Sequence, residues 1–292
     1  MIDAHHHIWR QKDLPWLLGP EKPRIFGAYD PIRRDYLIDE FLADIAKTGI
    51  EKSVYVQANW APNWWADEIA WVDKVAEATG WPHAIVGFLD FTRGDVRPAL
   101  EKVKHCQRLR GFRQQFHWHE NPLYRFAPGP AQFDSDTVRS NIQRLADYDW
   151  SFDLQVFAPQ MQDAAKLAKA CPEVTFILQH AGMLEDTSDE GWALWRDGMK
   201  ALADCNNVVT KLSGLGTFVR RNDPELIQQI VSETLKLFGA KRCMFGSNYP
   251  IEKIWTPYGD IVEAYRKATT GLPKGQQKAV FNDTAARIYR LD

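Results

Sequence analysis

The chain has 292 residues, of which 45% are hydrophobic and 25% are charged, the composition of an ordinary folded protein. Its 36 Lys and Arg residues nearly balance 38 Asp and Glu residues, so it lacks the net positive charge of a general nucleic-acid binder. Its longest apolar runs have the length of strands, which excludes a helix of about 20 apolar residues spanning a membrane.

The start of the sequence and its cysteines bear on the cellular compartment. The opening residues MIDAHHHIW lack both the basic and the apolar segment of a secretory signal peptide. The four cysteines lie far apart and form no C-x-x-C pair, so neither a structural zinc knuckle nor a disulfide framework is expected. We therefore expect a cytoplasmic protein without a nucleic-acid or membrane partner.

Eight apolar runs have the pattern of strands: Ile2–His7, Ser53–Asn59, Ala84–Phe91, Leu109–Phe116, Ser151–Phe157, Thr175–Ala181, Asn207–Leu212 and Arg242–Ser247. Segments with helical periodicity alternate with them: Ile38–Thr48, Glu68–Ala78, Asp136–Tyr148, Pro159–Ala170, Gly191–Asp204, Pro224–Phe238 and Asp260–Thr269. This alternation predicts an α/β fold, a single (β/α)8 barrel over residues 1–292. An open, doubly wound sheet is the alternative, but no G-x-G-x-x-G turn follows any strand.

Two connections are too long to be simple turns. Residues Trp9–Asp35 follow the first strand and His117–Asp134 follow the fourth, and both are rich in proline and aromatic residues. Long ordered loops are usually functional, and loops after barrel strands lie at the C-terminal end, where such folds keep their active sites. We expect both to act as lids that line the largest pocket, with Trp9 or Trp118 as an apolar wall.

Histidines stand at two strand ends. Side chains alternate along a strand, so Asp3, His5 and His7 are expected on one face, the barrel interior, with His6 facing outward in a structural role. Two such imidazoles can bind one cation or contact one substrate oxygen. His180 ends the sixth strand and Asn248 follows the eighth, where catalytic groups of a barrel stand.

Basic residues near the same end suggest an anionic substrate. Arg113 lies on the fourth strand and Lys211 ends the seventh, and guanidinium groups bind carboxylates in bidentate fashion. We expect both to orient a small acid or lactone-acid. His117, just beyond the fourth strand, and Trp9 are further candidates for substrate contact.

Four motifs in order along the chain, DAHHHIW, QHAG, KLSG and FGSNYP, resemble those of the amidohydrolase superfamily. More narrowly they resemble its amidohydrolase-2 group, which contains sugar lactonases and pyrone-dicarboxylate lactonase. The resemblance covers nearly the whole chain and implies a (β/α)8 barrel that hydrolyses its substrate at the C-terminal mouth. It also implies catalytic or metal-binding roles for His5, His7 and His180.

The sequence departs from the family pattern at three places. Asn248 stands where the family has an aspartate that takes the proton from water, and a neutral amide cannot do so. The fourth and fifth strands, GFRQQF and FDLQVF, lack the ligands of a second metal. The resemblance therefore leaves two states open: one divalent cation such as zinc on His5, His7 and His180, or no metal, with these histidines polarising the substrate carbonyl as hydrogen-bond donors.

The leading hypothesis is a hydrolase of a small lactone, derived from a sugar acid or an aromatic breakdown product. Glu252 and Asp90 are the candidate proton acceptors in place of Asn248. Because Asn248 is not a base, a lactone isomerase or a decarboxylase of a small carboxylic acid is the alternative, and a sugar-acid binding protein is a third. The sequence leaves the oligomeric state, monomer or homo-oligomer, open.

Overall fold

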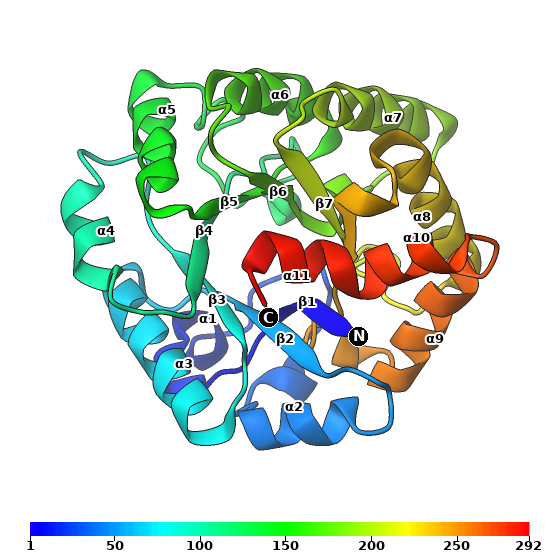
Figure 1. Ribbon diagram of the computed structural model, residues 1–292, viewed down its shortest axis with the longest axis horizontal. Coiled ribbons are helices and arrows are strands. Elements are labelled where there is room, and N and C mark those ends of the chain that lie inside the picture. Colours follow the sequence, from blue (N-terminus) through cyan, green and yellow to red (C-terminus); the bar gives the residue numbers. More distant parts are fainter. Residues whose placement is uncertain (292) are drawn as a thin grey trace.

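The computed structural model describes residues 1–291 and contains eight parallel strands that neighbour one another in sequence order (Figure 1). They are β1 (Ile2–His6), β2 (Lys52–Val56), β3 (Ala84–Phe88), β4 (Leu109–Gln115), β5 (Ser151–Gln155), β6 (Phe176–Leu178), β7 (Val208–Leu212) and β8 (Cys243–Phe245). The backbone beyond β8 meets β1, because Asn248 donates to the carbonyl of His5 at 2.7 Å and His7 donates to that of Tyr249 at 2.7 Å. The predicted barrel is confirmed.

Helices surround the strands in a ring (Figure 1). They are α2 (Ile38–Ile45), α3 (Trp65–Thr79), α4 (Arg97–Val103), α5 (Asp136–Gln143), α6 (Met161–Ala170), α7 (Asp189–Ala203), α8 (Pro224–Phe238) and α9 (Tyr258–Thr269). Side chains cap several of them: Asp223 accepts a hydrogen bond from the backbone of Leu226 at the start of α8. Helix α4 was not predicted, because its seven residues bury only Leu100 and Val103, too few to produce a helical stripe.

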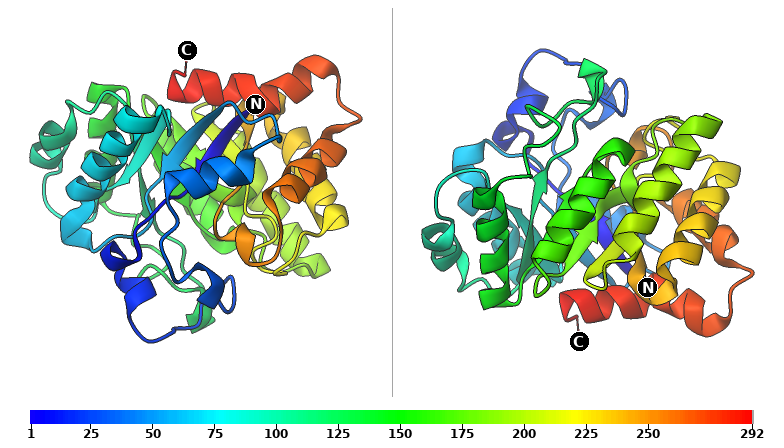
Figure 2. Two further views of the ribbon diagram at one scale, coloured as in Figure 1. Left: turned by 90° about the horizontal axis from the view of Figure 1, so that it is seen from below. Right: turned by 90° about the horizontal axis from the view of Figure 1, so that it is seen from above.

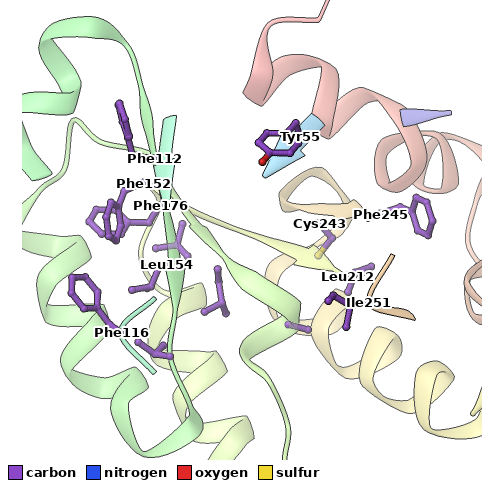
Figure 3. Packing of buried hydrophobic residues seen from close by; sticks show 14 of the residues in the cluster. Tyr55, Phe112, Phe116, Phe152, Leu154, Phe176, Leu212, Cys243, Phe245 and Ile251 are labelled. Atoms are coloured by element: carbon purple, nitrogen blue, oxygen red, sulfur yellow. The ribbon is translucent and has the colours of Figure 1, made fainter. Parts of the chain in front are cut away.

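The main core lies between the strands and the surrounding helices. Phe112, Phe152 and Phe176 are register partners on β4, β5 and β6 (Figure 3). The rings of Phe152 and Phe176 pack against each other, and Phe91 contacts both Phe112 and Phe152, which completes a row of packed rings. All three register partners are fully buried. Each such ring contributes about 1.5–3 kcal/mol of burial free energy, so the row stabilises the central strands.

The barrel is closed at the end where both termini lie. The C-terminal segment, α10 (Lys274–Lys278), a π-helical turn (Ala279–Asp283) and α11 (Thr284–Tyr289), crosses this end (Figure 1). Tyr289 packs in the barrel's interior cluster with Ile2 and Val54. A ligand therefore has to enter from the opposite end.

Both long loops project from that opposite end, as their positions after strands predict (Figure 2). The first carries the short helix α1 (Pro15–Leu18) and is anchored by Trp9, which pairs with Tyr36 through two backbone hydrogen bonds of 2.8 and 3.0 Å. Among residues 1–291, no helix has the length and apolar character needed to cross a membrane.

Strand β1 contains an irregularity that corrects one expectation. Its register against β2 shifts between Asp3 and His6, which breaks the simple alternation of side chains. The Asp3 carboxylate accepts hydrogen bonds from Ser247 at 2.6 Å and from Tyr258 of the outer helix α9 at 2.8 Å. The prediction that Asp3 shares the inward face with His5 is therefore wrong. His6 faces outward, stacked on Phe41 of α2 at 3.9 Å between ring centroids.

Candidate active site

One cavity at the open end collects side chains from four strand ends. His7 after β1, Arg113 on β4, His180 after β6 and Asn248 after β8 all line it, and its volume is about 90 Å³. His5 does not line the cavity but lies directly behind, with its ring centroid 4.7 Å from that of His180 and 5.1 Å from that of His7. The four residues that the sequence predicts to be catalytic, His5, His7, His180 and Asn248, therefore lie close together.

Close packing at Gly214 brings two of these groups side by side. A Cβ atom at this position would lie 2.7 Å from Nδ1 of His180 and 3.2 Å from Nδ2 of Asn248. The glycine of the KLSG motif is thus the residue that leaves room for them. His180 and Asn248 have φ values of +54° and +58°, a left-handed conformation that costs energy in a non-glycine residue and is concentrated at functional sites.

The cavity histidines are neutral, and their Nδ1 atoms are held by the protein. Nδ1 of His7 lies 2.7 Å from the carbonyl of Val56, and Nδ1 of His180 lies 2.9 Å from the Ser213 hydroxyl. Burial and the charge of Arg113 lower the pKa of His7 well below 6.5 and lower the pKa of His180 to about 3. Since a carbonyl only accepts, His7 carries its proton on Nδ1 and offers Nε2 as a hydrogen-bond acceptor.

A buried carboxyl group stands behind Asn248. Glu252 hydrogen-bonds the Asn248 side chain, and its carboxylate also accepts from Thr217 Oγ1 at 3.3 Å and from Trp255 Nε1 at 3.1 Å. Burial raises the pKa of Glu252 to about 8. Thr217 lines the cavity whereas Glu252 does not, so a hydroxyl group links this carboxyl to the cavity.

The other candidate base lies elsewhere. Asp90 does not line the cavity; its carboxylate accepts from Gln114 Nε2 at 3.1 Å and pairs with Arg93 at 3.1 Å. Of the two carboxyl groups named from the sequence, the structure therefore connects only Glu252 to the cavity.

A family model for amidohydrolases matches residues 2–291. This chain belongs to the amidohydrolase family. The protein y4mH of Sinorhizobium fredii is 36% identical to it, covering 100% of this chain and 98% of that protein. An L-fucono-1,5-lactonase of Burkholderia multivorans is 29% identical, covering 99% of this chain and 96% of the lactonase. The crystal structure of a B. multivorans amidohydrolase with bound zinc has a TM-score of 0.84 and 28% identity, covering 100% of this chain and 99% of that one. The amidohydrolase described here is accordingly a hydrolase.

The zinc in that related structure raises the question of a metal on His5, His7 and His180. Both ring nitrogens of His5 are buried without a hydrogen-bond partner from residues 1–291, so neither is already engaged and either could bind a metal. Among residues 1–291, however, no three His, Cys, Asp or Glu side chains are arranged to hold a metal ion. As they are arranged in this structure, the three imidazoles therefore do not fit a metal ion.

We expect at most one divalent ion per chain, because no carboxylate from residues 1–291 lines the cavity to hold a second. Elemental analysis of protein purified without added metal, and again after incubation with zinc and gel filtration, measures this number. Two tightly held ions per chain would contradict the prediction.

Two residues expected to touch the substrate lie behind the cavity wall. Lys211 is fully buried and pairs with Asp153 at 2.7 Å, so its charge is already partnered. The ring of His117 packs between Phe126 and Phe157, with centroid distances of 5.3 and 5.5 Å. Neither Lys211 nor His117 lines the cavity.

The two lids also differ in what they cover. The first loop lines the cavity with Trp9, Trp16, Arg24, Ile25 and Phe26. Residues of the second loop instead line a separate cavity that includes Trp118 and His119. The expectation that both loops line one pocket, the largest, is therefore wrong: the second loop lines the larger cavity, of about 460 Å³, together with Glu185 and Asp186 after β6.

Sequence reasoning did not single out Arg24 and Thr217. Arg24 lies in a loop that was predicted to cover the mouth, and Thr217 follows the KLSG motif, but neither position has a pattern that identifies a contact. Only the folded loops bring them to the cavity.

Proposed function

We propose that this amidohydrolase hydrolyses a small lactone in the cavity lined by His7, Arg113, His180 and Asn248. The observation that carries the proposal is the combination in one cavity of a guanidinium donor, neutral imidazoles and a hydroxyl that leads to a buried carboxyl group. The similarity to an L-fucono-1,5-lactonase over the full length of both chains supports it.

Arg113 is the group suited to polarise the ester carbonyl. Its Nε atom is buried without a hydrogen-bond partner from residues 1–291, while its terminal nitrogens donate to Gln57 O at 2.6 Å and to Gln155 Oε1 at 3.5 Å. Attack on a lactone carbonyl places negative charge on its oxygen, and a preorganised cation stabilises that charge. Arg113 thus fills the role of hydrogen-bond donor to the carbonyl that the sequence predicted for the histidines.

His7 and His180 are suited to hold the attacking water. Both imidazoles are neutral, and each has its Nδ1 atom in contact with a protein oxygen. Nε2 of His7 can therefore accept a hydrogen bond from the attacking water, and Nε2 of His180 can contact the same water. Asn248 adds an amide beside His180 that hydrogen-bonds water but cannot take its proton.

Glu252 is suited to take the proton through Thr217. As the water oxygen bonds to the carbonyl carbon, its proton passes to the Thr217 hydroxyl, whose own proton passes to the ionised Glu252. When the ring C–O bond breaks, the proton returns by the same route to the leaving oxygen. An acceptor with a pKa of about 8 is close to the range in which proton transfer is efficient near neutral pH.

A panel of lactones followed in a pH-stat tests the activity. Release of acid that exceeds the buffer rate supports hydrolysis. A rearranged ring without acid release, or release of CO₂ from the corresponding acids, would instead establish isomerisation or decarboxylation and refute the proposal.

The relay predicts a specific pH dependence. Glu252 accepts a proton only when ionised, so kcat/KM should rise with pH and level off above about pH 8. We expect Glu252→Gln to lower kcat/KM by about 100-fold and to remove this rise. Thr217→Val, which removes only the hydroxyl link, should lower kcat/KM by about 10-fold or more.

Thr256→Val is the matched control, because Thr256 is buried next to the same segment but does not line the cavity. It should leave the pH profile unchanged. A wild-type profile that is flat between pH 6 and 9, or one that Glu252→Gln leaves intact, would eliminate Glu252 as the acceptor.

A further inference from the structure

The first lid places an unpaired cation in the cavity. Arg24 is half-buried, its guanidinium lies 5.5 Å from the ring centre of Trp16, and its buried Nε atom has no hydrogen-bond partner in the described part of the chain. Within residues 1–291 its side chain forms no hydrogen bond or ion pair. Both Arg24 and Trp16 line the cavity.

Arg113 contributes a second cation that forms no direct ion pair among residues 1–291, although the charges of Asp153 and Glu68, which do not line the cavity, act on it. Among residues 1–291 its hydrogen bonds go to one backbone carbonyl and one side-chain amide, and burial lowers its pKa to about 10. No Asp or Glu from residues 1–291 lines the cavity. The cavity lining thus supplies two cationic side chains and no carboxylate to pair with them, which favours a ligand that carries negative charge.

The two cations serve different parts of such a ligand. Arg113 projects from β4 in the barrel wall, where His7 and His180 also line the cavity from strand ends, and the proposed function places the ester carbonyl at this end. Arg24 comes from the lid, beside Trp16 and Phe26. Hydrolysis of an uncharged lactone gives Arg24 no partner.

We infer that the substrate carries a carboxylate in addition to its lactone ring, and that Arg24 binds this carboxylate. The inference rests on the proposed function for the position of the ring. Guanidinium binds carboxylate with two parallel hydrogen bonds, and the neighbouring Trp16 and Phe26 offer apolar surface to the carbon skeleton. Arg24 is thus a specificity-determining residue supplied by the first loop.

A matched pair of substrates tests the inference. One is a γ-butyrolactone with a carboxylate on the ring carbon next to the ring oxygen, and the other is its carboxamide, which has nearly the same shape without the charge. We expect the wild type to prefer the carboxylate in kcat/KM. Arg24→Gln should reduce this preference by about 10- to 100-fold, the value of a charged hydrogen bond, with little effect on the carboxamide.

Arg33→Gln is the matched control. Arg33 belongs to the same loop and lies 5.9 Å from the ring centre of Tyr29, but it does not line the cavity and it donates to the Gly19 carbonyl. This variant should keep the preference of the wild type. Arg24→Lys should recover part of it, because it restores the charge without the two-pronged geometry.

Binding measurements test the anion subsite independently of whether the enzyme hydrolyses lactones. Titration calorimetry with glutarate, and with its uncharged diamide as the comparison, reports the subsite without turnover. A glutarate affinity that falls 10-fold or more in Arg24→Gln but not in Arg33→Gln supports the anion subsite. If neither lactone is hydrolysed, that result counts against the proposed function but not against the subsite. Equal use of both lactones, together with glutarate binding that does not depend on Arg24, would overturn the inference.

Discussion

Replacement of His180 by alanine is expected to lower kcat/KM by about 10³-fold. The imidazole lines the cavity beside Asn248, is neutral, and has Nδ1 held by Ser213, so its Nε2 is free to contact the reacting group. Loss of a group that contacts the reacting atoms costs on the order of 10²–10⁴-fold. The assay compares purified variants on the most active lactone, with the buffer rate subtracted.

Asn248→Ala supplies the contrasting measurement. An amide that only hydrogen-bonds water is worth about 0.5–1.5 kcal/mol, so this variant should lose about 2- to 13-fold. Because the His180 backbone is left-handed, His180→Asn is a second variant that tolerates this conformation and separates loss of chemistry from loss of folding. A thousandfold loss in Asn248→Ala, with His180→Ala near wild type, would reverse the roles proposed for the two residues.

The barrel could be predicted because all but one of the β/α units show a local strand and helix pattern in the sequence. Apolar strands followed by amphipathic helices do not depend on distant partners. The short helix α4 was not predicted, because it buries only Leu100 and Val103 and so shows no helical pattern of apolar residues. The face of Asp3 was misassigned because the register shift in β1 arises from pairing with β2, which no single strand reveals.

The candidate site could be predicted where residues stand at strand ends, and not where contacts form across the fold. His7, His180 and Asn248 reach the cavity because every strand of a barrel ends at the same mouth. Arg24 reaches it through the path of a long loop. The link from Thr217 to Glu252 joins residues 35 positions apart, and no spacing rule anticipates it.

Lys211 is a charged residue whose contacts could not be predicted from its position in the sequence. Its position at a strand end suggested a substrate contact, but in the fold it meets Asp153 of β5 across the intervening strand β6. Gln179 at the end of β6 also donates to the Asp153 carboxylate, at 2.9 Å. The positive charge of Lys211, which the sequence suggested would bind the substrate, is therefore paired with Asp153 inside the barrel.

Removal of Lys211 is expected to destabilise the protein by about 3–5 kcal/mol. The Lys211 and Asp153 side chains are both fully buried, and Lys211→Met would leave the Asp153 carboxylate without its cation. Burial already raises the pKa of Asp153, and the charge of Lys211 opposes that rise. Without Lys211 the folded state should hold a proton on Asp153 to still higher pH.

The sign of the pH dependence follows from that proton. The unfolded chain releases it near pH 4, whereas the folded variant keeps it, so the free energy of unfolding of Lys211→Met should fall as pH rises above about 4 and the deficit against wild type should widen. Urea unfolding at pH 5 and pH 8 measures both values.

Asp153→Leu combined with Lys211→Met should recover most of the lost stability, because it removes the carboxylate left without its ion-pair partner. Lys104→Met, which breaks an exposed pair with Glu101, is the control and should change stability by less than about 1 kcal/mol. A loss in Lys211→Met no larger than that of the control would show that the buried pair does not hold the barrel interior together.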